Sequence, residues 1–162
     1  MPKEIQLGRP SRSMRAMQRF MPKFTPIHTR LYRLSRGRLG TTRMTLGAPV
    51  LLLTTTGRRS GEERSVPIGH MEIDGEIVVA GTNGGLEPTP AWVLNLRSDR
   101  RCLVQIRGDR FEARAEFVGL DEYESLWNRL SESYPTYNQA QSWIAREIPL
   151  IRLRRIDQRS RR

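Results

Sequence analysis

The sequence predicts one α+β domain, mainly antiparallel β, in which helices flank a barrel or sheet. Three observations lead to this class. Short apolar or alternating segments recur between residues 50 and 153, with turn signals between them. Two dipeptides, Asp74-Gly75 and Gly108-Asp109, separate pairs of such segments and predict hairpins. The strand–helix–strand alternation of a parallel sheet is missing.

The first half of the domain contains three predicted strands and a helix. Residues 50–56 read VLLLTTT, an apolar and then threonine-rich run typical of a strand. Residues 64–73 and 76–81 form the first hairpin, because an Asp-Gly pair accepts the positive φ angles of a tight turn. Thr89-Pro90 predicts a helix start with the threonine as N-cap, and this helix runs to about Ser98.

The second half contains another hairpin, two helices and a last strand. Residues 102–107 and 111–118 flank the Gly108-Asp109 turn, and the second segment alternates apolar with charged side chains. Asp121 and Glu124 form a capping pair, which predicts that a helix begins there. The remaining elements are a helix over about 135–146 and a strand over 148–153.

Positive charge is concentrated at both ends of the 162-residue chain, whose formal net charge is +11. Residues 1–43 hold eleven Lys/Arg and one acid, whereas residues 44–151 hold eleven arginines and fifteen acids. We therefore expect a basic N-terminal arm over residues 1–43, a barrel domain over 44–156 and a basic tail over 157–162. No nucleic-acid partner is expected, because the charge lies in the ends and the middle is slightly acidic.

The N-terminal arm has two interpretations. Met14, Met17, Phe20, Met21 and Phe24 recur at helical spacing, with basic residues on the remaining arc. Such a helix suits the headgroup layer of an anionic membrane, or it packs over the barrel or a dimer partner. The chain contains no apolar run of the ~20 residues that span a bilayer and no secretory signal, so we expect a cytoplasmic protein. The membrane interpretation of the arm would place it on the inner face of the cell membrane.

Metal chemistry is not expected. Cys102 is the only cysteine, and the two histidines, His28 and His70, are not at ligand spacing.

A doubly basic loop, Gly57-Arg58-Arg59-Ser60-Gly61, joins the first two predicted strands. It lacks the length and the lysine of a Walker loop. Glycine amides, a hydroxyl and two arginine forks nevertheless suit an anion, and Arg64 on the next strand can join them. The alternative is a solvent-facing turn that happens to be basic.

Two further segments bear on function. Gly81-Thr82-Asn83-Gly84-Gly85 is a turn of small residues, where backbone can approach a flat ligand closely. It leads into the helix that carries Trp92, which is alternatively a core residue. Tyr134-Pro135-Thr136-Tyr137 places two tyrosines three apart, either at a functional site or packed at a helix start.

The chain resembles the deazaflavin-dependent nitroreductase family, whose members are also described as quinone reductases. The resemblance is carried by six motifs that follow one another in the family's order: TTTGRRSG, R-x-V-P, GTNGG, P-A-W-x-x-N-L, YPTY and QSW. The likeness covers about Leu46 to Leu153. It implies a split β-barrel of the flavin-binding type. It also implies hydride transfer from reduced deazaflavin coenzyme F-420 to a quinone-like, nitro-aromatic or other lipophilic acceptor.

The resemblance also implies the site. Tyr134 and Tyr137 match tyrosines that line the acceptor pocket. The arginines match a clamp on the coenzyme's tail, which carries a phosphodiester and glutamates. The implied cofactor-binding residues are Arg58, Arg59, Ser60, Gly61, Arg64, Pro67, Ile68, Thr82, Asn83, Gly84, Trp92 and Asn95.

This chain departs from the family pattern on the acceptor side. Many members have aromatic residues where this chain has Gly69 and Ala140, and Ser-Lys where it has Thr82-Asn83. The alternatives are therefore a non-catalytic module of the same fold that binds a cofactor or lipid, and a relative that uses flavin mononucleotide (FMN). Split barrels often pair, so a homodimer is also expected.

Overall fold

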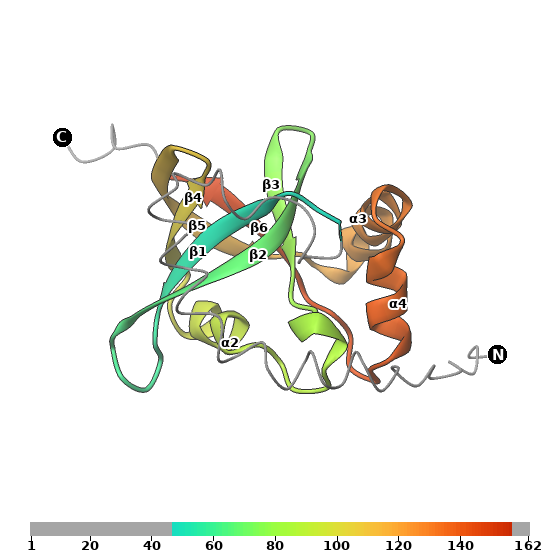
Figure 1. Cartoon of the computed structure of the whole chain (residues 1–162), viewed down its shortest axis with the longest axis horizontal. Coiled ribbons are helices and arrows are strands. Elements are labelled where there is room, and N and C mark those ends of the chain that lie inside the picture. Colours follow the sequence, from blue (N-terminus) through green and yellow to red (C-terminus); the bar gives the residue numbers. More distant parts are fainter. Residues whose placement is uncertain (1–46, 157–162) are drawn as a thin grey trace.

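The computed structural model describes residues 47–156, which form a closed barrel of six antiparallel strands with flanking helices (Figure 1). The strand order around the barrel is β1-β2-β3-β6-β5-β4, and β1 pairs with β4 to close it. This architecture confirms the predicted split β-barrel. The strands are β1 Val50–Thr56, β2 Glu63–Ile73, β3 Glu76–Ala80, β4 Arg101–Ile106, β5 Asp109–Phe117 and β6 Leu150–Arg155.

Within residues 47–156, three α-helices and one short 3₁₀ helix accompany the barrel. They are η1 Asn83–Gly85, α2 Ala91–Ser98, α3 Leu120–Ser133 and α4 Thr136–Ser142. None of these helices is long and apolar enough to cross a membrane. The predicted arm over residues 1–43 and the tail over 157–162 lie outside the described residues, so the arm's helix and its membrane contact stay predictions.

The barrel interior is filled by alternate residues of the strands and is closed at one end by α2. Leu51 and Leu53 of β1 lie on the inner face, where a strand directs every second side chain. Trp92, Val93 and Leu96 of α2 belong to the same buried cluster. The helix therefore caps the end of the barrel at which the β1–β2 loop also lies (Figure 1).

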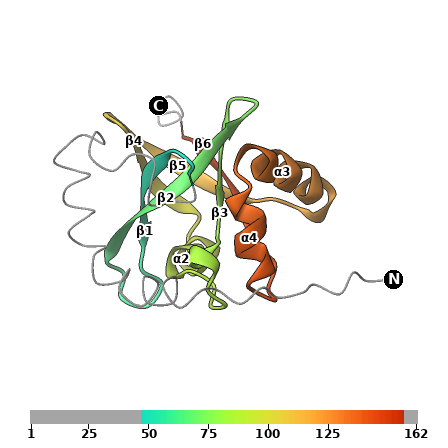
Figure 2. The ribbon, with the colours of Figure 1, turned by 45° about the vertical axis from the view of Figure 1, so that its right-hand side comes forward.

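A second buried cluster lies between the outer face of the barrel and helices α3 and α4 (Figure 2). Val78 of β3 and Leu150 of β6 face Leu130 of α3 and Ile144 within it. Burying a large aliphatic side chain stabilises a fold by about 1.5–3 kcal/mol. Packing on this face thus holds α3 and α4 against the sheet.

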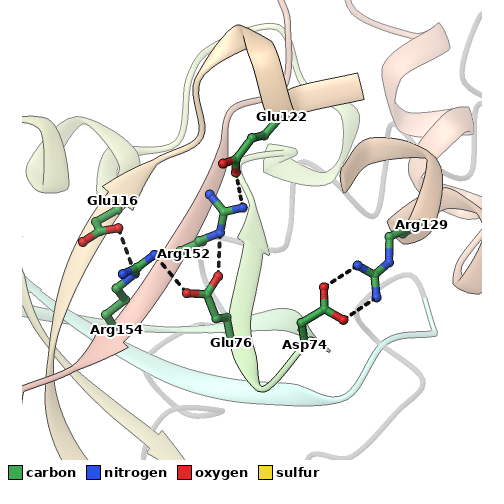
Figure 3. A network of polar contacts seen from close by, with 7 residues as sticks. All are labelled: Asp74, Glu76, Glu116, Glu122, Arg129, Arg152 and Arg154. Atoms are coloured by element: carbon green, nitrogen blue, oxygen red, sulfur yellow. Dashed lines mark hydrogen bonds and ion pairs between the residues drawn. The ribbon is translucent and has the colours of Figure 1, made fainter. Parts of the chain in front are cut away.

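An ionic network joins β3, β5, β6 and α3 (Figure 3). Arg152 of β6 contacts Glu76 through Nε at 2.7 Å and forms a second ion pair with Glu122 in the first turn of α3. Arg154 bridges Glu76 at 3.0 Å and Glu116 at 2.9 Å. Three strands and a helix are therefore connected through two arginines.

One of the two predicted hairpin turns is displaced by a residue. Asp74-Gly75 forms the β2–β3 turn as expected, and both residues have positive φ. The second turn is Arg107-Gly108 instead of Gly108-Asp109, because Asp109 already pairs within β5. The register of β4 against β5 is set by apolar pairs such as Cys102 with Ala113 and Val104 with Phe111. The Gly-Asp dipeptide alone does not reveal this register.

Both predicted helix caps are wrong. Pro90 occupies the N-cap position of α2 and Thr89 makes no capping bond. Gly119 precedes α3, and Asp121 lies within its first turn, where its charge favours the positive end of the helix dipole. Neither Pro90 nor Gly119 has a side chain that can accept a hydrogen bond, so both helices begin without a side-chain cap.

The last helix and strand also differ from expectation. Helix α4 ends at Ser142, before the predicted end near residue 146, and β6 spans Leu150–Arg155 instead of residues 148–153. The segment between them is irregular and contains Arg146, whose side chain binds backbone far away in sequence.

The ionic network generates a stability prediction. Arg152→Met removes both ion pairs of Arg152 while keeping its bulk. We expect the free energy of unfolding to fall by about 1–3 kcal/mol, because charge-assisted bonds of a poorly exposed side chain are lost. Urea denaturation at low salt measures this change.

Arg129→Met is the matched control. Arg129 binds Asp74 through both guanidinium nitrogens, at 2.6 and 3.0 Å, but its side chain is 48% exposed compared with 17% for Arg152. Its loss should lower the free energy of unfolding clearly less than the loss of Arg152, because ion pairs between exposed side chains contribute little to stability. Equal stability losses in the two variants would contradict the role given to Arg152.

Candidate functional site

The loop over residues 57–61, here called the arginine loop, connects β1 to β2 at the end of the barrel that α2 closes. The Gly57 amide donates to the Glu62 carbonyl at 2.8 Å, and the Gly61 amide donates to the Gly57 carbonyl at 2.7 Å. Gly61 has a φ of 71°, a conformation that favours glycine. Arg58, Arg59 and Ser60 are exposed on this closed loop.

Asn95 of α2 anchors the arginine loop. Its buried side chain accepts a hydrogen bond from the Arg58 amide at 3.1 Å and donates one to Thr55 Oγ1, also at 3.1 Å. Because this contact uses the backbone amide of Arg58, the side chain of Arg58 is left exposed on the loop. The resemblance implies that Asn95 binds the cofactor; the structure shows that its side chain fixes the loop on the helix, and its contact with a cofactor stays a prediction.

The three arginines near the loop differ in their partners. Arg64 donates to the Glu62 carboxylate at 2.5 Å, and this pair is largely exposed. Among residues 47–156, neither Arg58 nor Arg59 forms an ion pair. These two side chains therefore offer positive charge to a ligand, whereas the charge of Arg64 is shared with Glu62.

Two predicted ligand residues are buried in the barrel core. Ile68 of β2 and Trp92 of α2 belong to the interior cluster, at 9% and 8% exposure. Pro67 precedes Ile68 on the same strand, so it faces the opposite side, and it is half-buried. The burial of Trp92 favours its interpretation as a core residue, Ile68 is buried in the same cluster, and the contact of either with a ligand stays a prediction.

The glycine turn, residues 81–85, follows β3 and contains η1. Thr82 Oγ1 accepts from the Gly84 amide at 3.4 Å. Asn83 has a φ of 51°, and its Nδ2 donates to the Pro88 carbonyl at 2.8 Å. Two of the predicted side chains thus fold back on the local backbone and shape the turn.

Close packing explains two glycines of this turn. A Cβ at Gly85 would lie 2.5 Å from Trp143 Cε3, and Gly85 also has a φ of 78°. A Cβ at Gly81 would lie 2.8 Å from Pro149 and 2.9 Å from Val93 of α2. The turn therefore lies directly against α2 on one side and against the residues that follow α4 on the other.

Arg146 is a site residue that sequence reasoning missed. Its guanidinium donates to the carbonyls of Gly81 at 3.0 Å, Thr82 at 3.2 Å and Leu86 at 3.1 Å. Burial lowers its pKa, while the nearby Glu87 acts in the opposite direction. The available signal was a lone arginine within the apolar stretch WIAREIPL.

The two tyrosines lie at the junction of α3 and α4. Tyr134 is the C-cap of α3 and is half-buried, and its ring centre lies 6.3 Å from that of Tyr137 in an edge-on arrangement. Tyr137 is 3% exposed within the outer cluster, which also contains Ala140. Burial raises the pKa of Tyr137 to about 12, so this phenol stays protonated at neutral pH.

The structure brings most of the predicted site to one end of the barrel (Figure 1). Asn95 joins the arginine loop to α2, and Val93 of the same helix contacts the glycine turn. The turn then contacts Trp143, just after α4, whereas the tyrosines lie at the other end of α4. The site is thus a row of neighbouring elements: loop, α2, glycine turn and α4.

A cavity of about 430 Å³ lies at the opposite end of the barrel. Its lining includes apolar residues of the inner face, and Arg155 at its rim pairs with Asp109 and covers the Phe111 ring at 3.8 Å. It lies beside the β2–β3 turn and does not include the arginine loop. No group of three potential metal-binding side chains occurs within residues 47–156.

The comparison with known families gives the class of protein to which this barrel, with its basic loop and small-residue turn, belongs. The family model described as F420H(2)-dependent quinone reductase matches residues 25–154. The chain belongs to this family, whose members are oxidoreductases that depend on reduced coenzyme F-420.

Two relatives from Mycobacterium tuberculosis support this assignment. Rv3178, named for F420H(2)-dependent quinone reduction, is 33% identical over 106 residues, covering 65% of this chain and 89% of the relative. The F420H(2)-dependent quinone reductase Rv1261c is 28% identical over 132 residues, covering 80% and 88% of the two chains.

Solved structures agree with the fold. An F420-H2 dependent reductase, FDR-A, matches with a TM-score of 0.59 and 29% identity, over 70% of this chain and 99% of that chain. A protein described as a domain-swapped dimer matches with a TM-score of 0.61 and 26% identity, over 78% of this chain and 96% of that chain.

The anchoring role of Asn95 is testable. Asn95→Ala leaves the Arg58 amide and Thr55 Oγ1 without this partner, so we expect the free energy of unfolding to fall by about 1–3 kcal/mol. The loop should also open more often, so trypsin should cut faster after Arg58 and Arg59, as identified by the masses of the fragments.

The matched control is Asn138→Ala. Like Asn95, Asn138 accepts one hydrogen bond with its side-chain oxygen, in this case from Trp127 Nε1 at 3.0 Å, but it lies on the exposed surface of α4. Its loss should leave cleavage within the arginine loop unchanged. Equal acceleration of cleavage in both variants would argue against a specific anchor at Asn95.

The raised pKa of Tyr137 predicts a pH dependence. The ordinary pKa of tyrosine is about 10, and the folded protein raises that of Tyr137 to about 12. The folded state thus favours the neutral phenol, and the stability that this contributes is fully present below about pH 10 and is lost as the pH rises towards 12. Urea denaturation across this interval should show a smaller alkaline loss for Tyr137→Phe than for the wild type. Identical losses would show that Tyr137 does not carry the shift.

Proposed function

We propose that this protein transfers a hydride from reduced coenzyme F-420 to a quinone-like or another lipophilic acceptor. The observation that supports this most directly is the arginine loop. It presents two exposed arginines without ion pairs among the described residues, on a backbone held by Asn95. Family membership supplies the identity of the coenzyme.

The arginine loop fits the anionic tail of this coenzyme. Arg58 and Arg59 can each form two parallel hydrogen bonds with a phosphate or a carboxylate. The loop backbone is already ordered by the Gly57–Glu62 and Gly61–Gly57 bonds, so little conformational entropy is lost when the tail binds. Arg64 can add a third positive charge if the ligand replaces Glu62 as its partner, which costs little because the Arg64–Glu62 ion pair is exposed.

The glycine turn is the proposed position of the ring system. Its small residues allow close approach of the backbone to a flat ring, and Pro67 adds a rigid apolar surface. The bound coenzyme supplies a hydride donor, so the protein has to orient the donor and the acceptor and exclude water.

Tyr134 and Tyr137 are proposed to orient the acceptor. Tyr134 is half-buried and is therefore the better placed of the two to donate a hydrogen bond to a quinone oxygen, while the buried Tyr137 packs edge-on against its ring and orients it. Gly69 and the fully buried Ala140 supply no aromatic surface at two positions where the resemblance expects it. A nitro-aromatic acceptor is therefore the weaker candidate.

Two further features belong to the same proposal. The match to a domain-swapped dimer supports self-association of this chain. A lipophilic acceptor also suits the membrane contact predicted for the N-terminal arm, which lies outside the described residues.

The decisive experiment is a fluorescence titration with oxidised coenzyme F-420, with FMN in parallel. The wild type should bind the coenzyme, and the double variant Arg58→Ala/Arg59→Ala should bind it at least tenfold more weakly, about 1.4 kcal/mol or more. Higher salt should narrow this difference because the loop is exposed.

The alternatives predict other outcomes. Binding of FMN alone would place the protein among flavin-using relatives. Binding of the coenzyme without turnover of any quinone would leave a non-catalytic carrier. Unchanged affinity in the double variant would show that the arginine loop is only a basic turn.

A further inference from the structure

We propose that Arg146 and Glu87 form a clamp that holds the glycine turn in the shape required by the deazaflavin ring and ties it to the end of α4. This inference rests on the proposed function and adds a positioning residue to it. Neither residue was singled out by the sequence or by the resemblance. The clamp is defined as the side chains of these two residues with the backbone that they bind.

The guanidinium of Arg146 is bound almost entirely by backbone carbonyls of the turn and its exit. Its terminal nitrogens donate to the carbonyls of Gly81, Thr82 and Leu86. Its Nε donates to the Glu87 carbonyl at 2.6 Å. These acceptors lie about sixty residues earlier in the chain. A single side chain thus gathers carbonyls from both ends of the turn around one charge.

Glu87 completes the clamp from the other side. Its carboxylate oxygens accept the Ala145 amide at 3.0 Å and the Arg146 amide at 3.2 Å. The segment after the glycine turn therefore binds the backbone around Arg146 through the Glu87 carboxylate, and the segment after α4 binds the backbone of the turn through the Arg146 guanidinium. Because both interactions are charge-assisted, they are stronger than bonds between neutral groups.

The segment that carries Arg146 is itself ordered from α4. Gln141 donates through Nε2 to the Arg146 carbonyl at 2.9 Å and accepts the Ile148 amide at 3.2 Å through Oε1. Trp143 packs against Gly85 in the same region. The glycine turn is thus connected to the helix that begins beside the two tyrosines.

This arrangement points to positioning rather than to ligand contact. The donors of Arg146 are used on the protein's own backbone, so the side chain is not available to a second anion. A lysine cannot replace it, because an ammonium is a point donor and lacks the planar fork. Losing the clamp should leave the barrel intact while freeing the turn.

The test compares two ligands in the full-length protein. One is oxidised coenzyme F-420, and the other is its deazaflavin ring system without the phosphodiester and glutamate tail. For Arg146→Lys we expect both ligands to bind about tenfold more weakly, because the ring-binding turn is no longer preorganised. For Arg58→Ala/Arg59→Ala we expect weaker binding of the complete coenzyme alone.

Hydrogen exchange without ligand gives a second readout. The Gly85 and Leu86 amides bond within the turn, and in Arg146→Lys they should exchange about tenfold faster or more, while barrel amides are unchanged. Glu87→Gln keeps one acceptor oxygen, so the Gly85 and Leu86 amides should also exchange faster in this variant, but less so than in Arg146→Lys. Arg129→Lys, at the exposed pair with Asp74, should change neither ring binding nor exchange in the turn.

The outcomes separate the two proposals. A wild type that binds neither ligand overturns the proposed function. If the wild type binds both, unchanged ring affinity in Arg146→Lys and Glu87→Gln overturns the clamp's role alone. Faster exchange throughout the barrel in both variants would also overturn it, because Arg146 would then support the whole fold and not the turn.

Discussion

Closure of the barrel through β1 is the interaction on which the rest of the structure depends. This strand forms hydrogen bonds with β2 on one side and with β4 on the other, so no strand edge remains between them. The closed sheet encloses the interior cluster, and α2 closes one end of it. Because β1 ends beside α2, the arginine loop is placed where Asn95 can bind it.

The candidate site is built mostly by side chains that bind backbone. Asn95 holds the arginine loop, and Arg146 with Glu87 holds the glycine turn. These interactions leave Arg58 and Arg59 exposed and the turn compact. Such a site suits an enzyme whose bound coenzyme supplies the reactive atoms, because the protein then contributes orientation and charge. The ionic network of Arg152 lies away from these elements and connects α3 to the strands.

Several features could be predicted from the sequence because they depend on local pattern. The alternation along residues 111–117 follows from the period of a strand, and the Asp74-Gly75 turn follows from the φ angles that these residues accept. The arginine loop was identified as the link between two strands for the same reason. The resemblance then assigned the family, which the match over residues 25–154 confirms.

The sequence by itself determined the strands, the barrel class, the basic loop and the family, since each of these can be recognised within a few neighbouring residues or by their order. Only the tertiary structure decided where the helices begin, that Ile68 and Trp92 are buried, and what Asn95 and Arg146 do. Arg146 lies 65 residues from the Gly81 carbonyl that it binds. Side-chain to backbone bonds across such separations leave no periodic or compositional trace, because the backbone acceptor is the same at every residue.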